Sequence, residues 1–289
     1  MNWATALRLA RVSLLPTVWT NALAGVALAG GRWREGRMAL LLLGVSLAYI
    51  AGMFLNDAFD RRFDAEARPD RPIPAGLATV AEVFGLGWAL LAAACLSLFA
   101  VGLLAASPQW EVGIAGLVLA ALIVAYDAHH KQNPWSPLVM GACRMMVYVV
   151  AGLSVTPRPG AGLWLGAGVV LSYLVGLTYA AKTEHIERLE RAWPLLFLAA
   201  PLPYALSRAG AEPWTLLPLA IGAVWTLYAL RKLARRRPGD VDAAVGAMLA
   251  GIAIVDAIVL TGCGELGLGL FALLLFATCW RLQRWVRGT

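Results

Sequence analysis

The segment MALLLLGVSLAYIAGMFLNDAFDRRFDAEARPDRPIPAG (residues 38–76) joins a long apolar run to a dense group of charges. Its first part, residues 38–55, is nearly all apolar and close to the ~20 residues that cross a bilayer as a helix. Asp57, Asp60 and Asp64 follow at spacings of three and four, which places them on one side of a helix. The segment therefore predicts a membrane-spanning helix that ends in a cluster of carboxylates.

This cluster is unfavourable by mutual repulsion unless positive charge lies beside it. Asn56, four residues before Asp60, adds an amide oxygen on the same side. Mg²⁺ is a hard cation that takes oxygen ligands and is often shared between carboxylates and phosphate groups. We therefore expect Mg²⁺ as a cofactor, held by Asn56, Asp57, Asp60 and Asp64. The alternative is a solvated loop in which acids at a helix end are followed by ordinary surface arginines.

The loop after the acids, RPDRPIP (residues 68–74), is stiffened by its prolines. Arg68 and Arg71 in this loop carry guanidinium groups, and one guanidinium can donate two parallel hydrogen bonds to two phosphate oxygens. We expect both arginines to bind the diphosphate group of a substrate.

The composition identifies the class of protein. The chain has 289 residues, of which 60% are hydrophobic and 14% charged, whereas soluble domains have about 45–50% apolar and about 25% charged residues. We expect one integral membrane domain over residues 1–289, with no separate soluble domain. The net charge of +7 does not indicate nucleic acid as a partner, because the basic residues lie in loops between apolar runs. The scattered cysteines predict neither a disulfide framework nor a zinc site.

Counting apolar runs predicts ten spans, with nine as the alternative. The first is expected to be an uncleaved helix rather than a signal peptide. The seventh holds Pro194, Pro201 and Pro203 and is expected to be kinked or half-inserted. With both termini cytoplasmic, most cationic loop residues share one face. This places the chain in a membrane, by expectation the bacterial inner membrane, with the acidic loop cytoplasmic. The expected spans are 13–31, 38–57, 82–106, 111–127, 136–156, 162–182, 193–208, 214–233, 242–262 and 265–283.

A second charged segment, KTEHIERLER (residues 182–191), follows the sixth span on the same predicted face. We expect the two charged segments to close over a shared cavity. Glu184 lies nearest the span and is the better candidate for a metal ligand, while Lys182 is a candidate for direct contact with diphosphate. The alternative is an amphipathic connector with pairs such as Glu184 and Arg188 at helical spacing.

Charges inside spans are rare and usually face a protein interior. Arg144 and Asp256 both fall within predicted spans. We expect them to pair with each other or with other cavity groups, and the alternative is contact with substrate. We also expect Tyr148, Tyr173 and Tyr179 to line the cavity and steady a cation with their ring faces.

The motifs NDAFDRRFD and RPDRPIPAG resemble the first signature of the UbiA superfamily of intramembrane prenyltransferases. RVSLLPTVWTNALAG (residues 11–25) resembles the first helix of that family, in which Asn21 would line the cavity. YDAHHKQNPWSPLVMGACRMMVYVVAG (residues 126–152) resembles its fourth and fifth helices, with Tyr126 lining the cavity and Lys131 contacting the leaving group. Within the superfamily, the match is closest to the bacterial UbiA-like branch that includes the EboC proteins.

The resemblance implies an all-α polytopic bundle of nine to ten spans around a central cavity. It also implies a reaction, in which Mg²⁺ held by two acidic motifs binds a prenyl diphosphate and the resulting allylic cation alkylates an acceptor, commonly an aromatic ring. Asp57, Asp60 and Asp64 would be the catalytic acids. The chain departs from the family in its second motif, which holds no aspartate, so Glu184 would stand there. The alternatives are group transfer onto a polyprenyl phosphate on the same fold, and a non-catalytic lipid-binding or transport protein.

Overall fold

The computed structural model describes residues 1–31, 36–131, 133–183 and 192–286, and within these ranges the chain is helical, with no strand. The expected all-α class is confirmed. The helices are α1 (Trp3–Leu9), α2 (Leu15–Leu28), α3 (Met38–Phe59), α4 (Arg61–Ala67), α5 (Val80–Leu103), α6 (Trp110–His129), α7 (Ser136–Leu153), α8 (Ala161–Lys182), α9 (Pro201–Ala209), α10 (Leu216–Arg235), α11 (Asp240–Gly262) and α12 (Leu266–Leu282).

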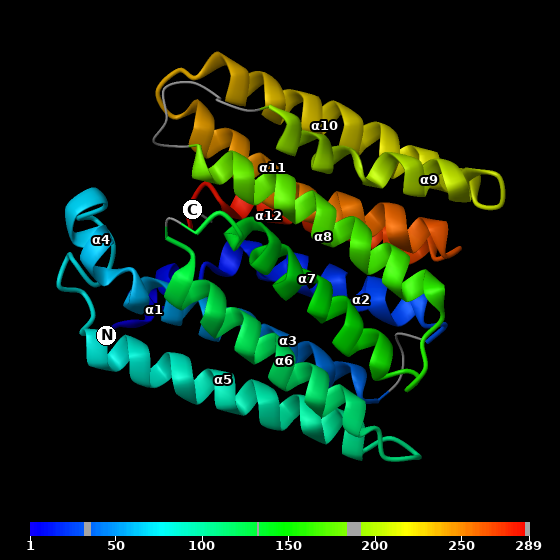
Figure 1. The fold of residues 1–289 in the computed structure, drawn as a ribbon, viewed down its shortest axis with the longest axis horizontal. Helices are drawn as coiled ribbons and strands as arrows, with labels where there is room; N and C mark the ends of the chain where they lie inside the picture. Colours follow the sequence, from blue (N-terminus) through cyan, green and yellow to red (C-terminus); the bar gives the residue numbers. More distant parts are fainter. Residues whose placement is uncertain (32–35, 132, 184–191, 287–289) are drawn as a thin grey trace.

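Successive long helices run back and forth along one axis, and the two termini lie at the same end of the bundle (Figure 1). Seven described helices are long and apolar enough to cross a membrane, and two shorter apolar stretches, Val12–Leu28 and Leu266–Leu282, accompany them. With the region around α9 as a further pass, the chain follows the predicted order of spans. Nine to ten spans therefore agree with the structure.

The expected break in the seventh span is present. Residues Trp193–Ala199 form a 3₁₀ segment that packs on α8, and α9 begins only at Pro201. Proline lacks the N–H that a continuing α-helix needs, which accounts for the interruption. The last two spans are joined by a short turn between Gly262, where α11 ends, and Leu266, where α12 begins. Gly264 in this turn has a positive φ of 81°, a conformation that glycine adopts easily.

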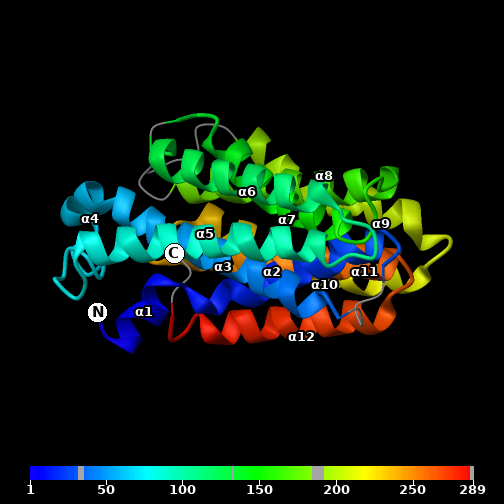
Figure 2. The same cartoon turned by 90° about the horizontal axis from the view of Figure 1, so that it is seen from below.

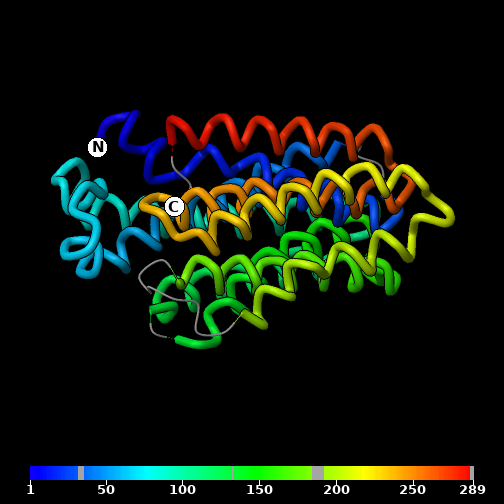
Figure 3. Tube along the Cα trace, turned by 90° about the horizontal axis from the view of Figure 1, so that it is seen from above, coloured from blue at the N-terminus to red at the C-terminus, as the bar shows by residue number. Residues whose placement is uncertain are grey.

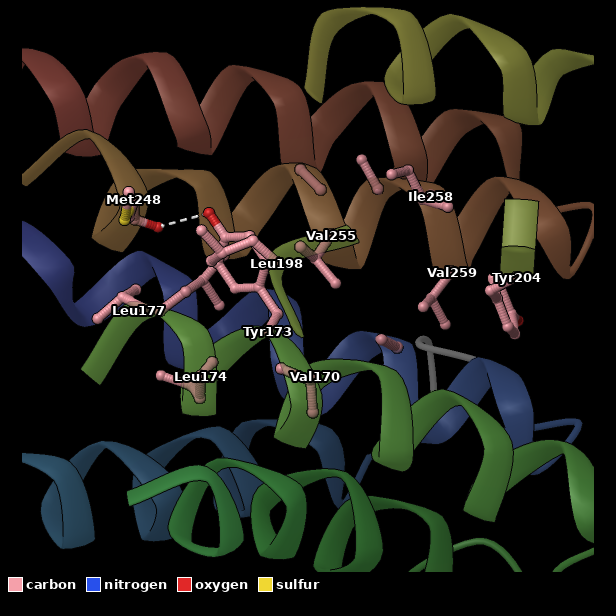
Figure 4. Packing of buried hydrophobic residues seen from close by; sticks show 14 of the residues in the cluster. Val170, Tyr173, Leu174, Leu177, Leu198, Tyr204, Met248, Val255, Ile258 and Val259 are labelled. Atoms are coloured by element: carbon pink, nitrogen blue, oxygen red, sulfur yellow. Dashed lines mark hydrogen bonds between the residues drawn. The ribbon is translucent and has the colours of Figure 1, made fainter. Parts of the chain in front are cut away.

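α11 forms the centre of the bundle and packs against α2, α8, α10 and α12. Most of its side chains are buried, as expected for a helix that is apolar all round and surrounded by others. Figure 4 shows Tyr173 of α8 reaching across to α11, where its hydroxyl donates a hydrogen bond of 3.0 Å to the backbone oxygen of Met248. Large apolar side chains such as Leu96, Leu196 and Val224 remain exposed on the outside, which suits a lipid-facing surface.

The short helices α1 and α4 lie at the end of the bundle where the chain begins (Figures 2 and 3). α3 leads directly into α4 at this end, so the acidic segment caps the bundle rather than crossing it. The fold thus gathers the charged residues of the first motif at one end of the apolar helices.

Candidate functional site

A cavity of about 390 Å³ opens between α2, α3, α6, α7, α8 and α11. Its walls are apolar over much of their area, with side chains such as Val18, Val45 and Leu177. One end carries acidic and cationic side chains from the α3–α4 segment and from the end of α6. The cavity therefore has a charged mouth and an apolar interior.

The three aspartates of the first motif lie on successive helical turns, as their spacing predicts. The backbone N–H of Asp60 donates to the oxygen of Asn56, and that of Asp64 donates to the oxygen of Asp60, both at 2.9 Å. Helical hydrogen bonding therefore continues through the boundary of α3 and α4. Asp57, Asp60 and Asp64 are all buried, and Asn56 and Asp60 line the cavity.

Two arginines supply positive charge beside Asp57. Nη2 of Arg11 lies 2.8 Å from Oδ1 of Asp57, and Nη1 of Arg71 lies 3.6 Å from the same oxygen. Arg11 precedes α2 in the left-handed region, with φ of 42°, and this backbone conformation turns the chain into the bundle. Contact between the two segments joins residues that are 46 positions apart.

Asp60 has a second set of partners from the end of α6. Nζ of Lys131 lies 3.0 Å from Oδ2 of Asp60, and Nε2 of His130 lies 3.4 Å from it. The His130 ring also stacks on Tyr126 at 4.9 Å. Burial alone raises the pKa of Asp60, but the hydrogen bonds and charges of His130 and Lys131 bring it below the usual aspartate value.

Asp64 differs from Asp57 and Asp60 in its hydrogen bonding. Oδ1 of Asp64 is buried and has no hydrogen-bond partner among the described residues. Burial raises the pKa of Asp64 above the ordinary aspartate value, although Arg71 opposes the shift. A buried carboxylate oxygen without a partner is costly, so this oxygen is suited to receive a cation.

Asp127 of α6 adds a fourth carboxylate to this end. Nδ2 of Asn56 donates a hydrogen bond of 3.2 Å to Oδ1 of Asp127, while Oδ2 of Asp127 is buried without a partner among the described residues. Asp127 also lines the cavity.

The oxygen donors match the chemistry of Mg²⁺, which prefers carboxylate and amide oxygens. Two buried carboxylate oxygens, one on Asp64 and one on Asp127, have no hydrogen-bond partner in the part of the chain that the structure describes, so they are available to a cation. Within the described ranges, no three His, Cys, Asp or Glu side chains are already arranged around one point. Asp57 and Asp60 are instead held by cationic side chains, so the residues fit the ion by type and by their unpaired oxygens rather than as a preformed cage.

The residues predicted to bind diphosphate lie around the same cavity. Arg68, Arg71, Lys131 and Lys182 all line it, together with Tyr126. Nζ of Lys182 contacts the backbone oxygen of Asn133 and, at 2.7 Å, Oγ of Ser136. Side chains from three separate parts of the chain, namely the loop after α4, the end of α6 and the end of α8, thus place positive charge at one mouth.

A second polar group lies deeper, between α2, α7 and α11. Nη1 of Arg144 donates a hydrogen bond of 3.0 Å to Oδ1 of Asn21, and Nδ2 of Asn21 donates to both carboxylate oxygens of Asp256 at 2.9 and 2.8 Å. Arg144 lines the cavity, whereas Asn21 and Asp256 lie buried behind it. The pairing of Arg144 with Asp256 is therefore indirect, through Asn21.

The expectation for the tyrosines is wrong for Tyr148 and Tyr173. Both are buried in the packed interior, where Tyr148 donates to Asp256 at 2.5 Å and Tyr173 donates to a backbone oxygen. Among the described residues, the tyrosines that line the cavity are Tyr49 and Tyr126.

Glu184, the expected second acidic ligand, lies outside the described residues. The sequence reasoning missed Arg11, Asp127 and Tyr49 as members of the site. Asp127 stands near the end of a predicted span, so the same search for charges in spans that singled out Arg144 would have found it. No pattern in the sequence marks Arg11 as a site residue, because its contact with Asp57 is visible only in three dimensions.

The chain is similar to known prenyltransferases over parts of its length. Digeranylgeranylglyceryl phosphate synthase of Methanoregula boonei is 41% identical over 98 residues, which are 33% of this chain and 32% of that protein. The matched region thus spans only about a third of that relative. Protoheme IX farnesyltransferase of Anaeromyxobacter sp. is 29% identical over 219 residues, which are 69% of this chain and 72% of the relative.

Solved structures share the fold. A structure of digeranylgeranylglyceryl phosphate synthase has a TM-score of 0.61 at 18% identity and covers 90% of this chain and 97% of its own. The apo structure of a UbiA homolog from Aeropyrum pernix has a TM-score of 0.51 at 16% identity, covering 95% and 98%. A model of the UbiA prenyltransferase family matches residues 17–252. Because this match includes most of the chain, and with it the motif around Asp60, the chain belongs to the UbiA prenyltransferase family.

Proposed function

We propose that this protein transfers an isoprenoid group from a prenyl diphosphate to an acceptor inside the membrane. The observation that carries the proposal is the cavity itself, with a charged mouth and an apolar interior between the helices. A prenyl diphosphate has the same division, with a strongly anionic head and a long hydrocarbon chain. The head would bind at the mouth and the chain between the apolar walls.

Cationic side chains at the mouth would bind the diphosphate. Arg71 and Lys131 now contact Asp57 and Asp60, and diphosphate oxygens would compete for the same N–H groups. Arg68 and Lys182 line the same cavity and add two further positive charges. Charge-assisted hydrogen bonds of this kind would stabilise the departing pyrophosphate, on which negative charge develops.

Mg²⁺ would be held by oxygen atoms of Asn56, Asp60, Asp64 and Asp127, with Asp57 beside them. This assignment is supported by one oxygen each of Asp64 and Asp127, which are buried and have no hydrogen-bond partner within the described ranges. When bound, the ion supplies Lewis-acid stabilisation of the leaving pyrophosphate. The first acidic motif and Asp127 would together replace the aspartates missing from the second motif, and Glu184 stays a candidate ligand.

The apolar interior would protect the allylic cation that forms when pyrophosphate leaves. Apolar walls exclude water, which would otherwise quench the cation. Tyr49 and Tyr126 line the cavity, and the faces of their rings attract positive charge. These two tyrosines would take the role first expected of Tyr148, Tyr173 and Tyr179.

The relatives support prenyl transfer but differ in the acceptors that their names imply. Those relatives include digeranylgeranylglyceryl phosphate synthases, a 4-hydroxybenzoate octaprenyltransferase of Aeromonas salmonicida and a protoheme IX farnesyltransferase. The acceptor of this chain is therefore left to experiment. Placement beside the EboC proteins, a bacterial inner membrane and a cytoplasmic mouth all stay predictions.

The test is to incubate the purified protein in lipid with Mg²⁺ and prenyl diphosphates of several lengths, measuring pyrophosphate release and product mass. Asp60→Asn should abolish turnover, because it removes a carboxylate charge at the mouth. Glu66→Gln is the matched control, since Glu66 is an exposed acid of α4 that does not line the cavity. Full activity of Asp60→Asn would overturn the site, and a product in which a polyprenyl phosphate has gained a group would favour the rival transfer reaction.

A further inference from the structure

The buried carboxylate of Asp256 is fully supplied with hydrogen bonds from α2 and α7. Oδ1 accepts from Tyr148 and Asn21, and Oδ2 accepts from Asn21 and Thr20. All four side chains are inaccessible to solvent. The two bonds to Asp256 fix the amide of Asn21, so that its oxygen points toward Arg144.

Arg144 uses one of its donors in this group and keeps others for the cavity. A guanidinium has five N–H donors, and the hydrogen bond to Asn21 uses one. Within the described residues, Arg144 makes no second hydrogen bond, and none of its nitrogens is buried without a partner. The side chain lines the cavity, with its guanidinium 5.6 Å from the centre of the Tyr49 ring. Its remaining donors therefore face the cavity.

This position is separate from the charged mouth. Lys182 contacts Ser136, where α7 begins, at the end that carries the acids. Arg144 follows Ser136 by eight residues, which corresponds to about 12 Å along a helix. A diphosphate bound by Arg71 and Lys131 at the mouth would leave the cavity-facing side of Arg144 open.

The arrangement differs from an ordinary structural ion pair. In such a pair the carboxylate contacts the guanidinium directly and fills its donors. Here Asn21 bridges Arg144 and Asp256, and the ion pairs found among the described residues, with N···O distances up to 4.0 Å, do not include a direct pair between the two. The negative charge of Asp256 lowers the free-energy cost of burying Arg144 in the membrane when no ligand is bound. Because Asn21 lies between the two charges, the other N–H donors of the planar guanidinium stay available to an anion.

We propose that Arg144 binds an anionic group, a carboxylate or a phosphate, on the acceptor molecule. Asn21 and Asp256 hold the guanidinium in place for this contact. The inference rests on the proposed function, because it assigns the acceptor of the same cavity. It predicts an acceptor that enters the membrane-embedded part of the cavity with one negative group and places its nucleophile toward the mouth.

Equilibrium binding tests the proposal without turnover. Full-length protein in lipid nanodiscs is kept with Mg²⁺ and inorganic pyrophosphate, which occupy the cationic mouth. One arm compares 4-hydroxybenzoate with the neutral 4-hydroxybenzamide, and the other compares geranylgeranylglyceryl phosphate with geranylgeranylglycerol. The wild type should bind the charged member of one pair about ten-fold to one-hundred-fold more tightly, the scale of charge-assisted hydrogen bonds. The arm that discriminates identifies the anion as carboxylate or phosphate.

Arg144→Gln should remove this preference while the affinity for the neutral probe stays the same. Arg144→Lys keeps the charge but not the planar fork, so it should restore part of the preference. Arg158→Gln is the control, because Arg158 is an exposed arginine outside the cavity. Equal binding of charged and neutral probes by wild-type protein would overturn the inference even if Arg144→Gln does not fold. Anion preference in a protein that never releases pyrophosphate from a prenyl diphosphate would overturn the proposed function alone.

Discussion

Nδ2 of Asn56 lies 3.2 Å from Oδ1 of Asp127, and this hydrogen bond joins the end of α3 to the end of α6. The two residues are 71 positions apart in the chain. The bond uses one oxygen of Asp127, while the other is buried at the cavity and has no hydrogen-bond partner among the residues that the structure describes. Asn56 therefore holds Asp127 beside the first acidic motif, and Oδ2 of Asp127 is available to bind a metal ion.

Asp127→Asn should weaken metal binding, because the amide can still accept from Asn56 but no longer carries a charge. We expect affinity for Mn²⁺, used as a spectroscopic substitute for Mg²⁺, to fall about ten-fold or more, since ligand charge tunes the affinity of oxygen sites. Electron paramagnetic resonance titration in the presence of pyrophosphate measures this affinity. Glu66→Gln should bind as the wild type does. Unchanged affinity in Asp127→Asn would remove Asp127 from the set of ligands.

Lys131→Met should change metal and diphosphate binding in opposite directions. Nζ of Lys131 lies 3.0 Å from Asp60 and 3.9 Å from the centre of the Phe63 ring. Removing the ammonium group leaves this Asp60 oxygen with His130 as its remaining partner, so Mn²⁺ should bind several-fold more tightly when diphosphate is absent. The KM for prenyl diphosphate should rise about ten-fold, because one charge-assisted contact is lost. If the affinities for Mn²⁺ and for prenyl diphosphate both fall, Lys131 only stabilises the folded structure of the mouth and does not compete with the metal for Asp60.

Arg11 and Asp57 should show strong coupling in folding stability. Both side chains are largely buried, and their closest atoms are 2.8 Å apart. Arg11→Met should cost about 3 kcal/mol, because it leaves a buried carboxylate with Arg71 as the nearest cation. Asp57→Asn in the same background should recover part of this loss. Unfolding of the four proteins in mixed detergent micelles gives the coupling energy, and strictly additive losses would contradict the ion pair.

The features that could be predicted from the sequence are those set by local order along the chain. Apolar length set the spans, and the prolines of the seventh predicted its break before α9. The spacing of Asp57, Asp60 and Asp64 predicted their successive turns, which helical hydrogen bonds now connect. Each of these features depends on neighbours within a few residues.

The features that were missed depend on contacts between distant segments. Arg11 meets Asp57 only because the chain turns at a left-handed residue before α2, and no local pattern marks a non-glycine in that conformation. Tyr148 was misplaced because α7 is apolar on most sides, so the pattern does not say which side faces the cavity. The hydrogen bonds from Arg144 to Asn21 and from Asn21 to Asp256 could not be predicted, because they depend on how α2, α7 and α11 pack together.

Gly25 should be needed for the close approach that brings Asn21 to Arg144. A Cβ added at Gly25, one turn beyond Asn21, would lie 2.5 Å from the backbone oxygen of Tyr148 and 2.9 Å from Cβ of Ala151. Gly25→Ala should therefore push α2 away from α7, costing about 1–3 kcal/mol of folding free energy.

The same substitution at Gly168 provides the control, because a Cβ added there meets nothing within 4 Å. Gly168→Ala lies within α8 and should stabilise the protein by about 0.5–1 kcal/mol through helix propensity alone. If α2 moves as expected, Gly25→Ala should also reduce the preference for the anionic probe, since Arg144 loses the partner that orients it. Equal stability of the two alanine variants would show that α2 and α7 can separate without cost, and the close approach would then not be what orients Arg144.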